Sequence, residues 1–320
     1  MMSSQAKVIE KLKQSIHPQE KGSESKKEEG TDELLPYMMD YLTPAMVEEA
    51  RTLLKETDDV RTLALEELRK YIEKEANLVT PTDDLFLLSF LRSRKFNVKK
   101  AFKLLQNYWC FRKDYRFIYD TSQKDSVARL ILRNFLGMLP YRDRNGCVVL
   151  IMKIGNWNPD EDTYEDLFRA ISAVLIHSNK FAATQVAGYR MIFDARHLTW
   201  AQLKYCTPAN ILLLVKSTQY CFPARYKGFH ILSENKLFNL AWSIVRPLLT
   251  QKLKKRIILH GNDLSPLLDY IHPSVLPDEY GGEGGPLENS KWLDVIENEA
   301  DNILGLLNYG YTGLNFRQSL

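Results

Sequence analysis

The most distinctive chemistry in the sequence is a cluster of basic side chains beside an apolar segment. The segment from Arg246 to Arg256, both included, contains five basic residues and no acidic one, and Arg225 and Lys227 precede it. The intervening residues 235–245 are apolar and almost uncharged. Basic groups beside an apolar helix are typical of proteins that bind an anionic membrane surface. A solvated charged face fits the pattern equally well. A nucleic-acid site is less favoured, because no aromatic residues interrupt the basic run.

Apolar side chains recur at regular spacing on three expected elements. Residues 189–194 and 228–232 have the composition of short buried strands, and residues 164–181 have helical periodicity. The side chains that share one face of these elements are Tyr189, Met191, Phe193, Phe229, Ile231, Phe168, Ile171 and Leu175. Such faces form either an ordinary core, which is the commoner case, or the wall of an apolar cavity, and spacing alone does not separate the two.

No motif of a familiar catalytic class accompanies these features. The sequence contains no HExxH, GxSxG, Walker or GxGxxG motif, and its four cysteines lack metal-ligand spacing. Asp194 and His260 each end an expected strand, but no nucleophile or partner base can be assigned to either. The glycine-rich stretch 281–285 leads into Pro286 and predicts a turn rather than a phosphate-binding loop. We therefore expect a protein that is not an enzyme and that uses no cofactor and no metal.

Composition and charge are those of a globular protein in a reducing compartment. The 320 residues are 45% hydrophobic and 26% charged, with a net charge of +3, which excludes wholesale disorder. No apolar run approaches the about 18 residues needed to cross a bilayer. The polar N-terminus carries no visible secretory signal. Four cysteines without paired spacing are not a disulfide framework, so we expect a cytoplasmic location.

The first part of the chain divides into a tail and a helical module. Residues 1–36 predict a flexible polar tail, because positions 18–33 contain no aliphatic or aromatic side chain. Helical spacing then dominates residues 42–118. The pair Thr43-Pro44 predicts the first helix start, since threonine caps helices and proline suits the first helical position.

The second part predicts an α/β fold. Residues 128–283 alternate expected strands with expected helices, which favours a mostly parallel sheet. A hairpin is predicted between strands at 138–142 and 147–154, because Asn-Gly lies between them. Residues 290–307 predict a last amphipathic helix, and residues 308–320 a loose tail.

Five motifs resemble the CRAL-TRIO family of lipid-binding proteins. LLSFLRSRKF at residues 87–96 resembles the helical N-terminal domain of that family. FPARYKG at 222–228, IVRPLL at 244–249, LHGN at 259–262 and LPDEYGG at 276–282 resemble its lipid-binding domain, in the same order. The similarity covers roughly residues 42–283. Within the family it is closest to the branch of the alpha-tocopherol transfer protein and the cellular retinaldehyde-binding protein.

The resemblance implies an architecture and a set of site residues. A helical module precedes a mostly parallel sheet, over which an apolar pocket holds one lipophilic ligand beneath a helical gate. The implied gate is residues 235–245, with Leu237, Phe238, Ala241, Ile244 and Val245. The implied pocket contains Phe168, Ile171, Leu175, Tyr189, Met191, Phe193, Ser217, Thr218, Phe222, Phe229 and Ile231.

The resemblance also implies a phosphatidylinositol bisphosphate site beside the gate. The positions that match the head-group residues of the tocopherol carrier are Arg94, Arg225, Lys227, Lys252 and Arg256, and all five are basic. Lys252 and Arg256 share a helical face if the helix expected at 247–255 extends that far.

The polar positions of the implied pocket differ from those of the tocopherol carrier. Ile171 and Leu175 stand where that carrier has serines, whereas Ser217 and Thr218 stand where it has aliphatic residues. Tocopherol itself is therefore in doubt, and retinoid, other isoprenoid, sterol and phospholipid ligands stay open.

The expected function is that of a non-enzymatic carrier of a small lipophile. It would exchange this ligand at membranes that contain phosphatidylinositol bisphosphate, and it would be cytoplasmic and transiently bound to endosomal or plasma membranes. The alternative is a phosphoinositide-binding adaptor in endosomal or vesicle traffic. Nucleic acid is not an expected partner, and the sequence identifies no protein partner.

Overall fold

The first described part of the chain is mainly helical. The computed structural model describes residues 34–119, 124–233, 236–261 and 263–312. The first helices are α2 (Pro44–Glu49), the π-helical turn η1 (Ala50–Leu54), α3 (Asp58–Glu73), α4 (Asp84–Ser93) and α5 (Val98–Asp114). The residues before the four α-helices, Thr43, Thr57, Asp83 and Asn97, each accept a hydrogen bond from the backbone N–H three residues on. The helix start predicted at Thr43-Pro44 is confirmed.

A five-stranded sheet forms the centre of the following part. Its strands are β2 (Leu136–Met138), β3 (Val148–Lys153), β4 (Tyr189–Asp194), β5 (Tyr226–Leu232) and β6 (Ile257–His260), adjacent in that order. β2 pairs antiparallel with β3, and all later neighbours are parallel. This confirms the mostly parallel α/β sheet expected from the alternating pattern.

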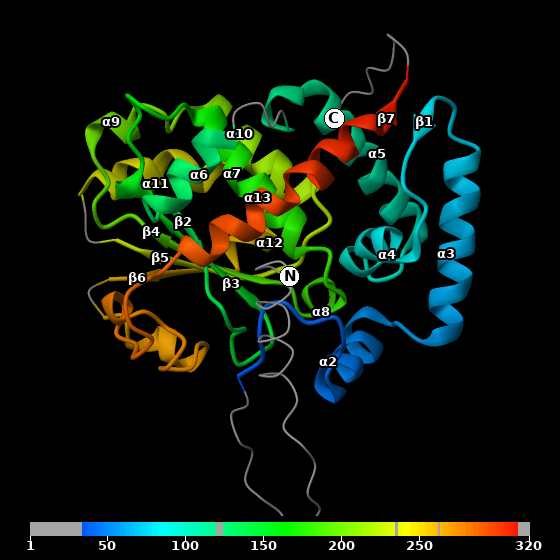
Figure 1. The fold of residues 1–320 in the computed structure, drawn as a ribbon, viewed down its shortest axis with the longest axis horizontal. Helices are drawn as coiled ribbons and strands as arrows, with labels where there is room; N and C mark the ends of the chain where they lie inside the picture. The colour runs from blue at the N-terminus through cyan, green and yellow to red at the C-terminus, as the bar shows by residue number, and fades with distance from the viewer. Residues whose placement is uncertain (1–33, 120–123, 234–235, 262, 313–320) are drawn as a thin grey trace, which may run out of the picture. The chain divides into compact units, whose positions relative to one another are not determined.

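The two faces of the sheet are covered by different segments (Figure 1). Helices α6 (Lys124–Leu132), α7 (Tyr164–Ser178), α10 (Pro208–Lys216) and α11 (Lys236–Leu248) lie over one face. The short helical turns η6 (Ser265–Asp269) and η7 (Asp278–Tyr280) lie under the other. Alternate strand residues separate accordingly, since Met191 joins the core beneath α7 whereas Ile192 joins the core beside the turns.

The hairpin strand differs from its expected position. We expected residues 138–142, but β2 is Leu136–Met138. Pro140 has no N–H for the ladder, and the residues after it pair elsewhere. Tyr141 forms a bridge with Pro36, and the N–H of Arg142 donates to the carbonyl of Leu35 at 2.7 Å. Residues 34–36, which we expected in the tail, therefore join the folded part, and residues 1–33 lie outside the described residues.

The C-terminal part returns to the helical module. Helix α13 (Ser290–Gly305) is followed by β7 (Gly310–Tyr311), which pairs antiparallel with β1 (Leu78–Val79). The ring of Tyr311 is buried, and its hydroxyl donates to Glu75 at 2.9 Å. We had expected a loose tail at residues 308–320, of which residues 313–320 lie outside the described residues. The apolar ring explains the difference, because it gains burial only by docking against the helices.

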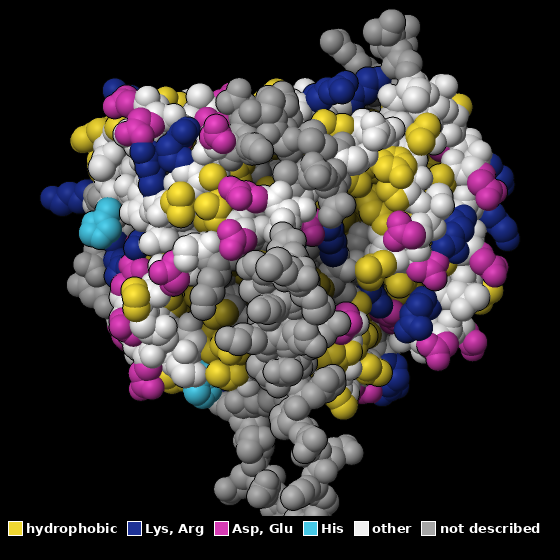
Figure 2. All heavy atoms as spheres, in the orientation of Figure 1, with side chains coloured by type: hydrophobic (Ala, Val, Ile, Leu, Met, Phe, Trp, Pro, Cys, Tyr) yellow, Lys and Arg dark blue, Asp and Glu magenta, His cyan; other side chains and the backbone are white. Residues whose placement is uncertain are grey.

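The visible surface shows no segregation of charge. On the face in Figure 2, Lys and Arg side chains are interspersed with Asp and Glu side chains among scattered apolar ones. None of the helices that the structure describes is both long and apolar enough to span a bilayer.

Candidate functional site

An apolar cavity lies between the sheet and the helices above it. Its volume is about 280 Å³, near the lower end of the range of ligand pockets. Strands β3 to β6 form its floor, α7 and α10 form its walls, and α11 covers it. Its lining includes Met152, Phe168, Ile171, Phe193, Phe229, Ile231, Val215, Phe238, Ala241, Trp242, Val245, Leu249, Leu253 and Ile257. Among the described lining residues none carries a charge, so this main cavity suits a neutral apolar ligand.

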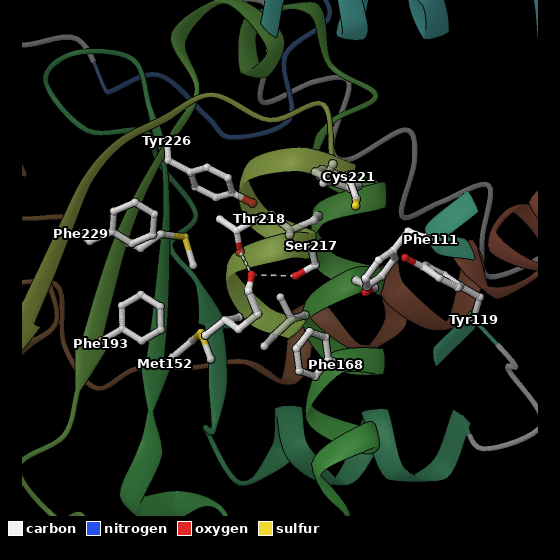
Figure 3. A pocket seen from close by; sticks show the side chains of 16 residues that line it. Phe111, Tyr119, Met152, Phe168, Phe193, Ser217, Thr218, Cys221, Tyr226 and Phe229 are labelled. Carbon is white, nitrogen blue, oxygen red and sulfur yellow. Dashed lines mark hydrogen bonds between the residues drawn. The ribbon is translucent and has the colours of Figure 1, made fainter. Parts of the chain in front are cut away.

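A smaller inner cavity of about 60 Å³ adjoins the main cavity. Figure 3 shows the side chains that line the inner cavity. The two cavities share Met152, Phe168, Ile171, Phe193, Leu214, Thr218 and Phe229 in their linings. The inner cavity has the more polar lining for its size, with the hydroxyl groups of Tyr119, Ser172, Ser217 and Tyr226. The larger main cavity adds the hydroxyl groups of Tyr164 and Tyr205 and the amide of Gln202 to an otherwise apolar lining. Burial raises the pKa of Cys221, which also lines it, to about 12, so this thiol stays protonated.

A π-helical turn presents the polar side chains of the inner cavity. This turn, η5 (Ser217–Cys221), continues α10 and begins with Ser217 and Thr218. Both hydroxyls donate to the carbonyl oxygen of Leu214, at 2.9 and 2.7 Å (Figure 3). π-Helical turns are rare and occur often at functional sites.

Helix α11 covers the main cavity with only part of the predicted gate. Phe238, Ala241 and Val245 line the cavity, and the ring of Phe238 stacks on Trp242 with centroids 6.0 Å apart. The two other gate residues pack beside the cavity: Leu237 next to Leu198 and Leu203, and Ile244 next to Ile211 and Leu249. Trp242 also lines the cavity and is not among the predicted gate residues, although its spacing of four from Phe238 places both on one helical face.

The structure brings ten of the eleven predicted pocket residues into the cavity walls. Phe168, Ile171, Phe193, Thr218 and Phe229 line both cavities, Ile231 lines the main one, and Leu175, Met191, Ser217 and Phe222 line the inner one. The exception is Tyr189, whose side chain lies outside both linings. Tyr189 is the first residue of β4, and its hydroxyl lies 2.9 Å from the hydroxyl of Ser178. Burial raises its pKa, so it remains a neutral core tyrosine.

Tyr226 lines the inner cavity, and the sequence pattern did not reveal it. Strict alternation along β5 places Tyr226 on the face opposite Phe229. The pairing between β4 and β5 is irregular, however, because Tyr189 pairs with Tyr226 but Arg190 pairs with Gly228. The unpaired Lys227 is a β-bulge, which shifts the alternation by one residue and puts Tyr226 and Phe229 on the same face.

The predicted head-group residues gather where β5, α12 (Gln251–Lys254) and the end of α4 meet. The pKa of Lys252 is lowered by burial and by the neighbouring positive charges of Arg256, Arg94, Lys95 and Arg225. Burial also lowers the pKa of Arg94 and that of Arg256. Cations held so close together without equal counter-charge favour an anionic ligand.

Lys252 and Arg256 do not share a helical face, contrary to the prediction for a helix that extends to residue 256. Helix α12 ends at Lys254, and Arg256 lies between it and β6. The positive charge of Arg256 nevertheless contributes to lowering the pKa of Lys252. Both Lys227 and Arg256 also line an open polar cavity of about 690 Å³.

An acidic residue that the sequence did not single out lies among these cations. Glu49, the last residue of α2, accepts hydrogen bonds from Lys227 at 2.6 Å and from Arg225 at 3.2 Å. No sequence signal pairs it with residues that lie more than 170 positions away. We refer to Arg94, Arg225, Lys227, Lys252 and Arg256 as the basic cluster, with Glu49 as its counter-ion.

The strand-end groups that resembled catalytic residues belong to internal networks. The side chain of Asp194 accepts hydrogen bonds from Arg196 at 2.7 Å and from Tyr280 at 3.2 Å. The Nε2 atom of His260 lies 2.9 Å from the Nδ1 atom of His230. Neither group lines the two apolar cavities.

Comparison with known proteins identifies relatives along most of the chain. Clavesin-1 of Xenopus laevis is 32% identical over 258 residues, which cover 80% of this chain and 78% of that protein. The alpha-tocopherol transfer protein-like protein of Homo sapiens is 31% identical over 264 residues, covering 82% and 77%. Clavesin-2 of Homo sapiens is 31% identical over 265 residues, covering 82% and 81%.

Two family matches follow the order of the fold. The CRAL/TRIO N-terminal domain matches residues 64–107, within the helical module. The CRAL/TRIO domain matches residues 132–282, which carry the sheet, the two cavities and α11. The resemblance predicted from five short motifs is thereby confirmed, and the chain belongs to the CRAL/TRIO family.

Proposed function

We propose that this protein is a non-enzymatic carrier of a neutral lipophile, which it exchanges at membranes containing phosphatidylinositol bisphosphate. The observation that carries the proposal is the uncharged cavity of about 280 Å³ covered by α11. Burial of about 400–500 Å² of ligand surface is worth on the order of 10 kcal/mol before the costs of association. A ligand held in this way leaves slowly unless the cover opens.

The cavity and the basic cluster are connected through shared elements. In α12, Leu253 lines the main cavity while the adjacent Lys252 belongs to the basic cluster. In η5, Thr218 lines both cavities, and the carbonyl of the adjacent Gln219 accepts a hydrogen bond from Arg94 at 3.1 Å. An anion bound by the cluster therefore acts on the same two segments that hold the ligand.

Membrane binding supplies a reason for the cover to open. An open α11 exposes Phe238, Trp242 and Val245 to water, which is unfavourable. Insertion of these side chains into a membrane interface removes that cost, and each basic residue near an anionic surface adds about 1 kcal/mol. The ligand then passes between protein and bilayer. The expected location is the cytoplasm, with transient residence at endosomal or plasma membranes.

The relatives support transfer without specifying the ligand. One of them is named an alpha-tocopherol transfer protein-like protein. On α7, however, Ile171 and Leu175 are apolar where the tocopherol carrier has serines, and η5 carries the hydroxyl groups of Ser217 and Thr218 where that carrier has aliphatic residues. We therefore propose a lipophile class and not tocopherol itself.

Transfer of a fluorescent lipophile between vesicles tests the proposal. Acceptor vesicles contain either phosphatidylinositol bisphosphate or phosphatidylserine at equal total charge, at fixed ionic strength. We expect faster transfer to the phosphoinositide acceptor, and we expect the double variant Lys252→Ala, Arg256→Ala to lose this difference. The double variant Lys70→Ala, Lys74→Ala removes the same charge from exposed positions of α3 and its C-terminal cap and is the matched control.

Two outcomes separate the carrier from the adaptor. Equal transfer to both acceptors, together with normal sedimentation on phosphoinositide vesicles, would contradict gated exchange and favour an adaptor in vesicle traffic. Organic extraction of the purified protein followed by mass spectrometry adds a second test. A carrier retains a lipophile in about equimolar amount, whereas an adaptor with an unused cavity does not.

A further inference from the structure

The hydroxyl groups of Ser217 and Thr218 in η5 each donate a hydrogen bond within the protein. Ser217 and Thr218 both donate to the carbonyl oxygen of Leu214. A hydroxyl group has one proton to donate and two lone pairs with which to accept. What these two side chains still offer to the inner cavity is therefore acceptor capacity. They suit a ligand group that donates a hydrogen bond.

The opposite wall offers a donor. Tyr226 is buried and lines the inner cavity, and in Figure 3 its hydroxyl points across the cavity toward η5. Within the described part of the chain, no hydrogen bond satisfies this hydroxyl, whereas the hydroxyl of the neighbouring Tyr189 bonds to Ser178. Burial raises the pKa of Tyr226, so the group keeps its proton. A buried donor without a partner is costly, and a ligand acceptor would remove that cost.

The lack of charged side chains in the described cavity linings limits which ligands the two cavities can bind. Among the described residues that line the two cavities, none is Asp, Glu, Lys, Arg or His. A carboxylate or a phosphate placed there would be buried without a counter-charge. The ligand is therefore neutral, and its polar group both accepts and donates.

We propose that the inner cavity recognises the hydroxyl group of a neutral lipophilic alcohol, which accepts a hydrogen bond from Tyr226 and donates one to Thr218 or Ser217. The apolar body of the ligand then lies in the main cavity beneath α11, with the hydroxyl group innermost. This inference rests on the proposed carrier function and narrows its ligand class. An aldehyde, ketone or ether accepts but does not donate, and a hydrocarbon does neither.

Matched probes test the assignment in the full chain. Hexadecan-1-ol, its methyl ether and hexadecane compete with a bound fluorescent lipophile, and phytol, its methyl ether and phytane form a second series with a branched body. We expect each alcohol to compete at least tenfold better than its ether or hydrocarbon. A buried hydrogen-bonding site strongly rejects analogues that leave it unpaired.

Near-isosteric variants locate the two hydrogen bonds. Tyr226→Phe and Thr218→Val each remove one hydroxyl group, and we expect each to reduce the preference for the alcohol severalfold. Tyr189→Phe is the matched control, because it removes a buried hydroxyl from the neighbouring strand that lines neither cavity. Circular dichroism and thermal unfolding verify the fold of each variant.

These experiments distinguish a failure of the hydroxyl assignment from a failure of the carrier proposal. If alcohol, ether and hydrocarbon compete equally with the wild-type protein, the hydroxyl assignment is overturned and the carrier proposal stands. An unchanged preference in both Tyr226→Phe and Thr218→Val overturns it as well. If the protein binds neither the fluorescent lipophile nor any competitor, the carrier proposal itself fails. The comparison of ligands in the wild-type protein requires no variant to fold.

Discussion

The carboxylate of Glu49 accepts a hydrogen bond from the ammonium group of Lys227 at 2.6 Å. Glu49 ends helix α2 of the N-terminal part, whereas Lys227 is the bulged residue of strand β5. The side chain of Glu49 is 17% exposed and that of Lys227 is 26% exposed, so the ion pair is partly shielded from water. Glu49 therefore occupies the basic cluster at the place where we propose that a phosphate group binds.

Glu49→Gln should strengthen binding to phosphoinositide vesicles. The substitution removes a carboxylate that competes with the lipid phosphates for Lys227 and Arg225. A partly exposed ion pair of this kind is worth about 1 kcal/mol, which corresponds to about a fivefold change in affinity. Vesicle sedimentation at several salt concentrations measures the effect, which should shrink as salt rises.

Glu48→Gln provides the control for this prediction. Glu48 precedes Glu49 on the same helix and pairs with Arg51 at the surface, where both side chains are more than half exposed. It changes the net charge equally but leaves the basic cluster intact. If both variants gain the same affinity, the effect is one of net charge, and Glu49 does not compete for the site.

The sequence predicted the parts of this molecule that depend on local rules. Thr43 caps a helix because of its own hydroxyl and the following proline, and the alternation of Met191 and Phe193 places both on one face of β4. The structure puts these two side chains together in the inner cavity wall. Such features require only neighbouring residues, so periodicity and composition are sufficient to find them.

Features that depend on distant partners were not predictable. Tyr226 reaches the inner cavity because the bulge at Lys227 breaks the alternation, and the bulge exists only where β4 and β5 pair. Glu49 approaches the basic cluster only once α2 packs on the sheet domain. Tyr311 is buried because β7 pairs with β1, which lies more than two hundred residues earlier in the chain. Each of these contacts is set by tertiary packing, which the pattern of a single segment does not encode.

Phe193→Asp should abolish retention of the lipophile. The ring of Phe193 lines both cavities and stacks on Phe229, with centroids 6.1 Å apart. A carboxylate at this position loses the stacking and is buried without a partner, which costs several kcal/mol, or about a hundredfold or more in affinity. Equilibrium binding of a fluorescent lipophile measures the loss.

Phe117→Asp is the control, because its ring is 44% exposed and lines neither cavity. Circular dichroism accompanies both variants to detect unfolding. A folded Phe193→Asp protein that binds lipophiles normally would show that they bind elsewhere.

Acid should destabilise the protein through His230. Arg190 always donates, so the Nε2 atom of His230, 3.1 Å from the Arg190 guanidinium, is an acceptor and carries no proton. Burial, followed by the charges of Arg190 and His260, lowers the pKa of His230 to about 3. Among the described residues, the rings of His260 and Tyr270 pack against it.

The sign of the pH dependence follows from this shift. Between pH about 6.5 and 3 the unfolded chain protonates this histidine and the folded chain does not, so stability is full above pH 6.5 and falls as pH falls. The slope from one proton is at most about 1.4 kcal/mol per pH unit. Urea unfolding at pH 7, 6 and 5 should show a smaller decrease for His230→Gln than for the wild type. The exposed His197→Gln should behave like the wild type, and equal slopes in all three proteins would refute the assignment to His230.

Phe238→Ser should loosen the cover of the main cavity. Phe238 lines the cavity and stacks on Trp242, so the substitution removes apolar burial and adds a hydroxyl group with no partner. A loss of about 1–2 kcal/mol of apolar burial predicts spontaneous ligand release about tenfold faster. Sedimentation on phosphoinositide vesicles should be nearly unchanged, because Phe238 is not part of the basic cluster. Stopped-flow release of a fluorescent lipophile into excess neutral vesicles measures the rate.

Leu240→Ser separates closure from a general weakening of α11. Leu240 is on the same helix but is 46% exposed and does not line the cavity. Its loss should leave spontaneous release unchanged. If Leu240→Ser accelerates release as much as Phe238→Ser does, the helix has been destabilised as a whole. If neither variant changes the rate, α11 is not the barrier, and the ligand leaves by another route. Faster release from Phe238→Ser alone, with membrane binding retained, is the result that a cover held by cavity contacts requires.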